Sequence, residues 1–147
     1  DAATSLLKTL VEPIEVIRDL KLDRPLGSRF ENVKFKRLES WRSNRSLANL
    51  KLNIRSLEVF FLGNSPKFEG LRPLISQQEV KKIQESFNDI KTALSKIAPP
   101  LEDAIITKEG YQTSINISTA LTRLHKNLES AISHSGIRLG FNSRDGD

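Results

Sequence analysis

One series of apolar residues constrains the fold of this chain more than any other feature. Between positions 80 and 97, apolar side chains recur at alternating steps of three and four residues: Val80, Ile83, Phe87, Ile90, Leu94 and Ile97. An α-helix places such a series along one side, which must then be covered by other helices. The pair Pro99 and Pro100 is expected to end this helix, because proline lacks the backbone N–H. The pattern predicts one seam of a helical bundle.

The same spacing predicts three further helices. The first covers about residues 3–20, where Pro13 should kink or interrupt the hydrogen bonds and Leu26-Gly27 follows as a stop. The second begins at Ser43 or Ser46, either of which fits an N-cap, and ends near Gly63. The third includes positions 117–132 and closes near Gly136, and one more turn is expected around 101–106. No strand-like alternation of useful length competes with these helices.

The length of the chain and of its predicted loops indicates one domain of the all-α class. The 147 residues suit a single helical-bundle domain over 1–147, with about four long helices. The joints at 64–73 and 99–110 are short enough to connect antiparallel neighbours. We therefore expect an up-and-down bundle.

Composition removes several classes of function. Without cysteine, the chain has no disulfide, thiolate zinc site or cysteine nucleophile. No window reaches the roughly 18 apolar residues that would span a bilayer. The chain starts at Asp1 and contains no methionine, which we interpret as a piece of a longer protein.

The two histidines form no recognisable metal or catalytic motif. His125 and His134 are nine residues apart, so a helix turns them to opposite sides. His125 and Glu129 share a face at i and i+4 and are weak metal candidates, although exposed polar pairs often have this spacing. Motifs for di-iron bundles, zinc proteases, phosphate loops and serine hydrolases are absent, so a self-contained enzyme of a familiar class is not expected.

A polar row beside the apolar stripe of the second helix is a candidate binding surface. Arg45 stands at its start, and the row consists of Ser46, Asn49, Asn53 and Ser56. Amides and hydroxyls there can bind a ligand or a second domain, or can satisfy neighbouring polar groups of the bundle. Both interpretations stay open.

Positive charge is concentrated in the same part of the chain. Residues 29–55 hold eight Lys and Arg against Glu31 and Glu39, with three aromatic residues between the charges. The composition suits an anion-binding strip, a docking surface for an acidic protein or a solvated face, and we do not expect nucleic acid as a partner.

The last residues form a second oxygen-rich cluster. Asn142, Asp145 and Asp147 lie within a short, glycine-punctuated stretch. They can hold a hard cation or receive an arginine, while a solvated terminus is the simpler explanation.

At these residues the sequence resembles the imelysin family. Residues 39–50, ESWRSNRSLANL, are similar to the family's second-half Arg-Ser-Leu segment, and residues 139–147, LGFNSRDGD, to its ending. Residues 21–27, KLDRPLG, resemble the linker after the family's corresponding helix. The family's Gly-x-His-x-x-Glu motif has no counterpart, since Arg123 and Ile132 occupy the glycine positions before the two histidines.

The resemblance implies a two-domain helical protein that is exported to the periplasm or held at the bacterial surface, with a lipid anchor in some members. It implies a role in iron uptake, a nominal classification as a metallopeptidase, and a divalent metal or iron bound mainly by the amino-terminal half. This chain would be the carboxy-terminal half and would contact that other half. Its expected contribution is one wall of an inter-domain site for an iron compound or a peptide.

The residues expected in that wall are Arg45, Ser46, Asn49, Asn142, Asp145 and Asp147, and no catalytic residue is expected in this chain. Arg45 would orient a carboxylate, Asn49 would supply an amide contact, and Ser46 a cap or a hydroxyl contact. Two alternatives remain: the non-catalytic half of a metallopeptidase, and a basic helical module for protein interaction.

Overall fold

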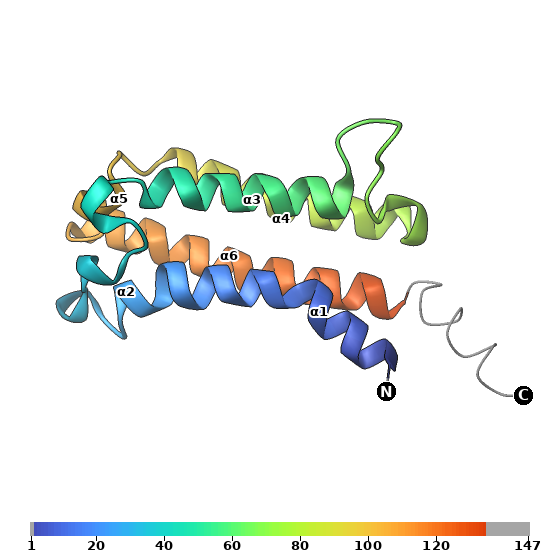
Figure 1. The fold of residues 1–147 in the computed structure, drawn as a ribbon, viewed down its shortest axis with the longest axis horizontal. Coiled ribbons are helices and arrows are strands. Elements are labelled where there is room, and N and C mark those ends of the chain that lie inside the picture. Colours follow the sequence, from blue (N-terminus) through green and yellow to red (C-terminus); the bar gives the residue numbers. More distant parts are fainter. Residues whose placement is uncertain (1, 135–147) are drawn as a thin grey trace, which may run out of the picture.

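The computed structural model describes the backbone of residues 2–134 and the side chains of residues 9–134. Its long helices are α1 (Ala2–Val16), α3 (Ser46–Leu62), α4 (Gln77–Ser95) and α6 (Lys108–Ser133). They run alternately up and down along one long axis (Figure 1). Within residues 2–134 there is no strand beyond an isolated bridge between Ser65 and Phe68. The predicted all-α, up-and-down bundle is confirmed.

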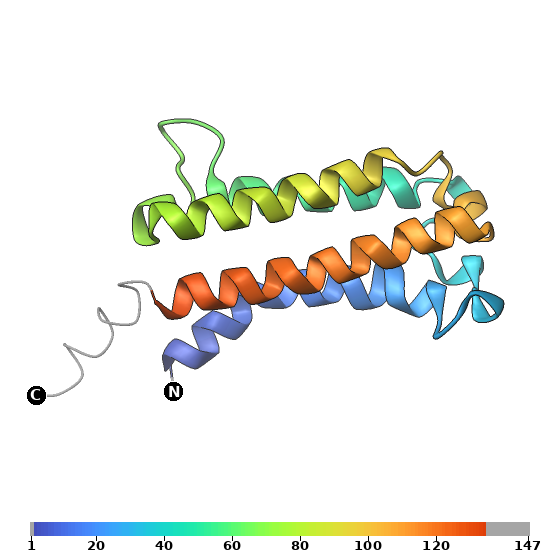
Figure 2. The same ribbon diagram turned by 180° about the vertical axis from the view of Figure 1, so that it is seen from behind.

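The first helix continues past α1 with a change of helix type. A π-helix, η1 (Ile17–Asp23), follows it and leads into the short α2 (Arg24–Leu26), which ends at Gly27 as predicted. The buried side chains Ile17 and Leu22 are five residues apart, and a π turn brings such a pair onto one side. Pro13 lies inside α1, and the ribbon bends on its amino-terminal side, as expected for a missing N–H (Figure 2).

Short helical turns lie in the connections between the long helices. Three 3₁₀ turns, η2 (Phe30–Asn32), η3 (Phe35–Arg37) and η4 (Trp41–Ser43), occupy the basic connection between α2 and α3. A further 3₁₀ turn, η5 (Arg72–Leu74), precedes α4, and α5 (Leu101–Ala104) is the turn predicted before the last long helix. The helix α4 ends at Ser95, before the Pro99-Pro100 pair.

The predicted cap of α3 is wrong. The N-cap is Arg45, whose side chain makes no capping hydrogen bond, while Ser46 is already the first helical residue. The Ser46 hydroxyl instead contacts the Glu39 carbonyl oxygen and the Glu102 carboxyl, and the Ser43 hydroxyl donates to the Ser40 carbonyl. The connection and α5 therefore fix the start of α3.

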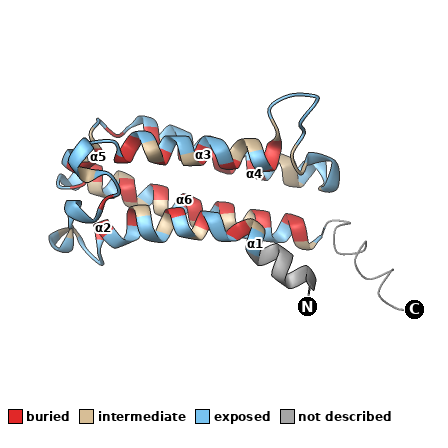
Figure 3. Ribbon diagram, in the orientation of Figure 1, coloured by how far each residue is buried: buried red, intermediate tan, exposed pale blue. Residues whose placement is uncertain are grey.

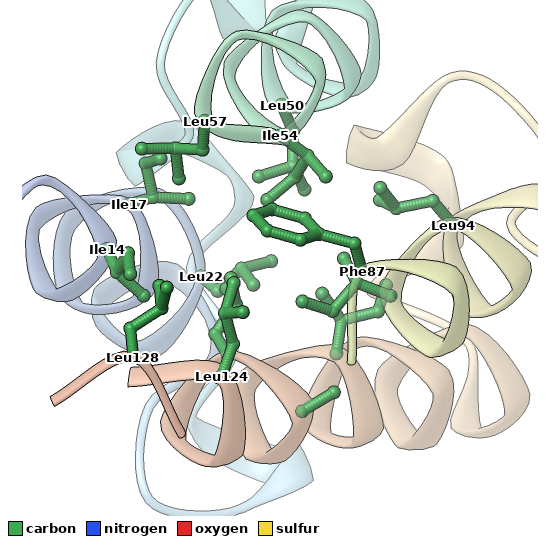
Figure 4. Packing of buried hydrophobic residues seen from close by; sticks show 14 of the residues in the cluster. Ile14, Ile17, Leu22, Leu50, Ile54, Leu57, Phe87, Leu94, Leu124 and Leu128 are labelled. Atoms are coloured by element: carbon green, nitrogen blue, oxygen red, sulfur yellow. The ribbon is translucent and has the colours of Figure 1, made fainter. Parts of the chain in front are cut away.

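The apolar seams predicted for α3, α4 and α6 meet in one core. Figure 3 shows the buried positions on the sides of the helices that face each other. In the close view of Figure 4, Phe87 from α4 extends between residues of α3 and α6, among them Ile54 and Leu124. Both of these and Phe87 are at most 1% exposed. Val80 alone of the α4 series is only half-buried, because it lies in the first turn.

The two ends of the bundle differ in what they carry. The basic connection, the start of α3 and α5 lie at one end, and the start of α4 lies at the other (Figure 1). His134 contacts Glu79 in that first turn of α4. No helix in the described part of the chain is long and apolar enough to cross a membrane.

Candidate functional site

The basic connection, residues 28–45, folds over the end of the bundle on apolar and aromatic contacts. Leu38 is buried in the core, and the Phe30 ring meets the edge of Tyr111 on α6 at 5.5 Å between centroids. The Trp41 ring contacts Phe35 and carries the Arg42 guanidinium at 4.7 Å from its centroid. Leu38 and Phe30 thus hold the segment against the bundle, while Trp41 contacts a cation of the segment itself.

Ser46 and Glu102 tie this segment to α3 and α5. The Ser46 hydroxyl contacts the Glu39 carbonyl oxygen and Oε1 of Glu102, and both side chains are about nine-tenths buried or more, at 5% and 4% exposed. The Oε2 atom of Glu102 is buried and has no hydrogen-bond partner within the described residues. Glu102 therefore holds the first residue of α3 through the Ser46 hydroxyl alone.

The polar row on α3 is occupied by contacts inside the chain. Asn53 Oδ1 accepts from Lys21 Nζ at 2.5 Å, and the same ammonium pairs with Glu39 at 2.5 Å. Asn49 Nδ2 donates to the Ser40 hydroxyl at 3.2 Å, and the Ser56 hydroxyl donates to the Leu52 carbonyl. These contacts favour the interpretation that the row satisfies polar groups of the bundle, and the role of Asn49 in ligand binding stays a prediction.

Arg45 differs from the row that follows it. Its side chain is exposed and makes no hydrogen bond or ion pair with any described residue. Five more basic side chains of the connection also lack an acidic partner in residues 9–134: Arg29, Lys34, Lys36, Arg37 and Arg42. The acids at this end include Glu31, Asp103 and Glu109, none of which forms an ion pair with these basic side chains, and the buried Glu102. Basic side chains outnumber these acids, so this end of the bundle has a net positive surface that can attract anions.

His125 lies between two carboxylates and does not complete a metal site. Its Nε2 is 3.2 Å from Glu15 Oε1 on α1, and its Nδ1 is 3.9 Å from Glu129 Oε2. Both carboxylates are about half exposed, and no group of three or more His, Asp and Glu side chains that could hold a metal occurs among the described residues. The donors among the described residues therefore do not fit the metal that the resemblance implies.

At the other end of the bundle, His134 contacts Glu79. Its Nδ1 is 3.3 Å from Glu79 Oε1, and Glu79 forms a capping box with Ser76 at the start of α4. Burial raises the pKa of Glu79, but hydrogen bonds from the Ser76 backbone and hydroxyl, together with His134, outweigh burial and hold the pKa below its ordinary value.

This lowered pKa gives a testable pH dependence. The folded chain holds the Glu79 proton more weakly than the unfolded chain, so the stabilisation is complete above the ordinary pKa of 4.5 and is lost as pH falls through the lowered pKa of the folded chain. We expect Glu79→Gln to cost up to about 1 kcal/mol at neutral pH, with the cost shrinking as pH falls below the ordinary pKa. Urea unfolding at a series of pH values measures it, and a pH-independent cost would contradict it.

The predicted tail residues Asn142, Asp145 and Asp147 lie outside the described residues. Their role in the inter-domain wall stays a prediction.

Comparison with protein families decides the relationship of this chain. The family model for imelysin matches residues 1–128, most of the 147-residue chain. The chain belongs to the imelysin family. Comparisons with curated proteins and with solved structures gave no match. The match includes the Arg-Ser-Leu segment that contains Arg45, Ser46 and Asn49, and it ends before the 139–147 segment that had also suggested an imelysin relative.

Two residues of this candidate site were not predicted from sequence. Glu102 was expected only as part of a connecting turn, and an acid in the first turn of a helix is too common to indicate burial. Lys21 lies on the first helix, and its pairing with Glu39 and Asn53 depends on the path of the connection between them. Tertiary contacts alone identify both.

Proposed function

We propose that this imelysin chain forms one wall of a binding site for an anionic iron compound in a bacterial cell-envelope protein that serves iron uptake. A second helical domain of the same protein would form the opposite wall and hold any metal. The observation that carries the proposal is the exposed, unpaired Arg45 beside a buried Ser46–Glu102 contact. The exported location and the role in iron uptake rest on the family relationship.

Arg45 has the chemistry and the support that such a wall requires. Its guanidinium presents a planar fork of N–H donors that fits a carboxylate with two parallel hydrogen bonds. Its backbone is anchored by the helix that begins at Ser46, and Ser46 is fixed from two sides by the Glu39 carbonyl and Glu102. A ligand therefore meets an arginine whose side chain is free and whose backbone position is set.

The surrounding charges favour a multiply charged anion. Arg42 lies over the Trp41 ring and Lys36 is 5.7 Å from the centroid of the same ring, so these two cations are held near the end of the bundle without neutralisation by an acid. Ferric citrate is a suitable probe because its carboxylates carry the charge and the iron together. A peptide without acidic side chains offers only its carboxy-terminal carboxylate, so the surrounding cations favour the multiply charged iron compound over such a peptide.

Calorimetry with the full-length protein tests the proposal. We expect Arg45→Ala to weaken ferric citrate binding about 10- to 100-fold, the loss expected for a charged hydrogen-bonded contact. Arg123→Ala is the matched control, since Arg123 is exposed on α6 and lies at 3.9 Å from Asp89. Equal binding by the wild type and Arg45→Ala would contradict the proposal, as would hydrolysis of peptides that depends on Arg45 without binding of the iron compound.

A further inference from the structure

A concave surface lies in the groove between α3 and α4. Its volume is about 450 Å³, within the range of roughly 300–1,000 Å³ that is usual for small-molecule sites. Lys51, Arg55 and Glu58 border it from α3, and Lys91 borders it from α4. Between them, Val59 and Leu94 give it an apolar floor.

The charges in this groove are not balanced. Glu58 is neutralised by Lys91, whose Nζ lies 2.8 Å from Glu58 Oε2 and 3.1 Å from Oε1. Lys51 and Arg55 make no hydrogen bond or ion pair with any described residue. They are four residues apart on one helix face, a spacing at which like charges repel. An anion bound between them would relieve this repulsion, and the concave apolar surroundings would strengthen its attraction.

The groove is separate from the surface that contains Arg45. At 100° per residue, Lys51 points about 160° away from Asn49 and from Asn53, whose row faces α1 and the connection. Arg45 does not border the groove. A ligand in the groove would therefore act independently of the proposed inter-domain site.

The lining specifies the kind of ligand. Two unpaired cations at one side and an apolar floor suit a molecule with an anionic head group and an apolar body, while the alkyl parts of Lys51, Arg55 and Lys91 extend the apolar contact. We propose that the α3–α4 groove binds an amphipathic organic anion such as a medium-chain fatty acid, with the head group between Lys51 and Arg55 and the chain over Val59 and Leu94.

Calorimetric titration of the full-length protein with decanoate, below its micelle concentration, tests this inference. We expect saturable binding that weakens as NaCl rises from about 0.05 M to about 0.5 M. The double variant K51A/R55A should bind decanoate roughly tenfold more weakly or worse, because both charged contacts are lost. Its fold should be kept, as both side chains are exposed, and circular dichroism checks this.

Three controls make the outcome decisive. K81A/K126A removes the same charge from exposed positions of α4 and α6 and should bind like the wild type. Arg45→Ala should also bind decanoate normally, which separates this site from the proposed function. Decyltrimethylammonium has the same chain with a cationic head and should not bind at the groove. Absence of decanoate binding, unchanged binding by K51A/R55A, or competition by the cationic detergent would each overturn the inference.

Discussion

Replacement of Phe87 by alanine is expected to lower the free energy of unfolding by about 3–5 kcal/mol. Phe87 is 0% exposed and lies at the meeting point of α3, α4 and α6 (Figure 4). Its ring is surrounded by side chains on neighbouring helices, such as Ile54 and Leu124, which cannot move in far enough to fill the space. The cost therefore includes both the lost burial and the remaining cavity.

Chemical denaturation followed by helical circular dichroism measures this loss. Asn88→Ala is the matched control, because Asn88 is the next residue and is exposed, and it should change stability by less than about 0.5 kcal/mol. A cost below about 1 kcal/mol for Phe87→Ala would show that the three helices do not pack around this ring.

The second large effect is expected at Gly110, where α6 begins against α5. A Cβ atom added to Gly110 would lie 2.0 Å from the carbonyl oxygen of Ala104 and 2.6 Å from its carbon, so the backbone of α5 would have to move. We expect Gly110→Ala to destabilise the chain by about 3 kcal/mol, because this overlap outweighs the gain of about 1 kcal/mol in helix propensity.

The same substitution links the fold to the site. Displacement of Ala104 moves α5, which carries Glu102 and its contact with Ser46, so ferric citrate binding should weaken along with stability. Lys108→Ala, at an exposed position two residues earlier, should leave both unchanged within about 0.5 kcal/mol. A stable Gly110→Ala variant with unchanged binding would contradict the packing of α5 described above.

The spacing of apolar residues predicted the long helices, because the buried side of each helix recurs every three or four residues. The residues predicted for the α3 and α6 seams, from Leu47 to Phe61 and from Ile117 to Ile132, are buried. The start of α3 was predicted wrongly, since a serine beside an apolar run is a usual N-cap signal. Here Ser46 instead bonds to Glu39 and Glu102, a contact between residues up to 56 positions apart that no local pattern contains.

The candidate site could be predicted only in part for the same reason. Sequence indicated the polar and basic character around Arg45 and left open whether the row bound a ligand or satisfied the bundle. The pairing of Lys21 with Glu39 and Asn53 depends on how the connection folds back over the bundle, and this determines which polar groups stay free. Arg45 is distinguished from Ser46 and Asn53 by this tertiary arrangement alone.

The most direct test of the account asks whether Arg45 touches the ligand. Phenylglyoxal modifies accessible arginine side chains, and mass spectrometry of the full-length protein measures the rate at each arginine with and without ferric citrate. We expect Arg45 to be strongly protected by ferric citrate, while Arg123 on α6 reacts at the same rate in both conditions. If Arg45 reacts equally fast while ferric citrate is bound, the ligand does not lie against this wall and the proposed site is wrong.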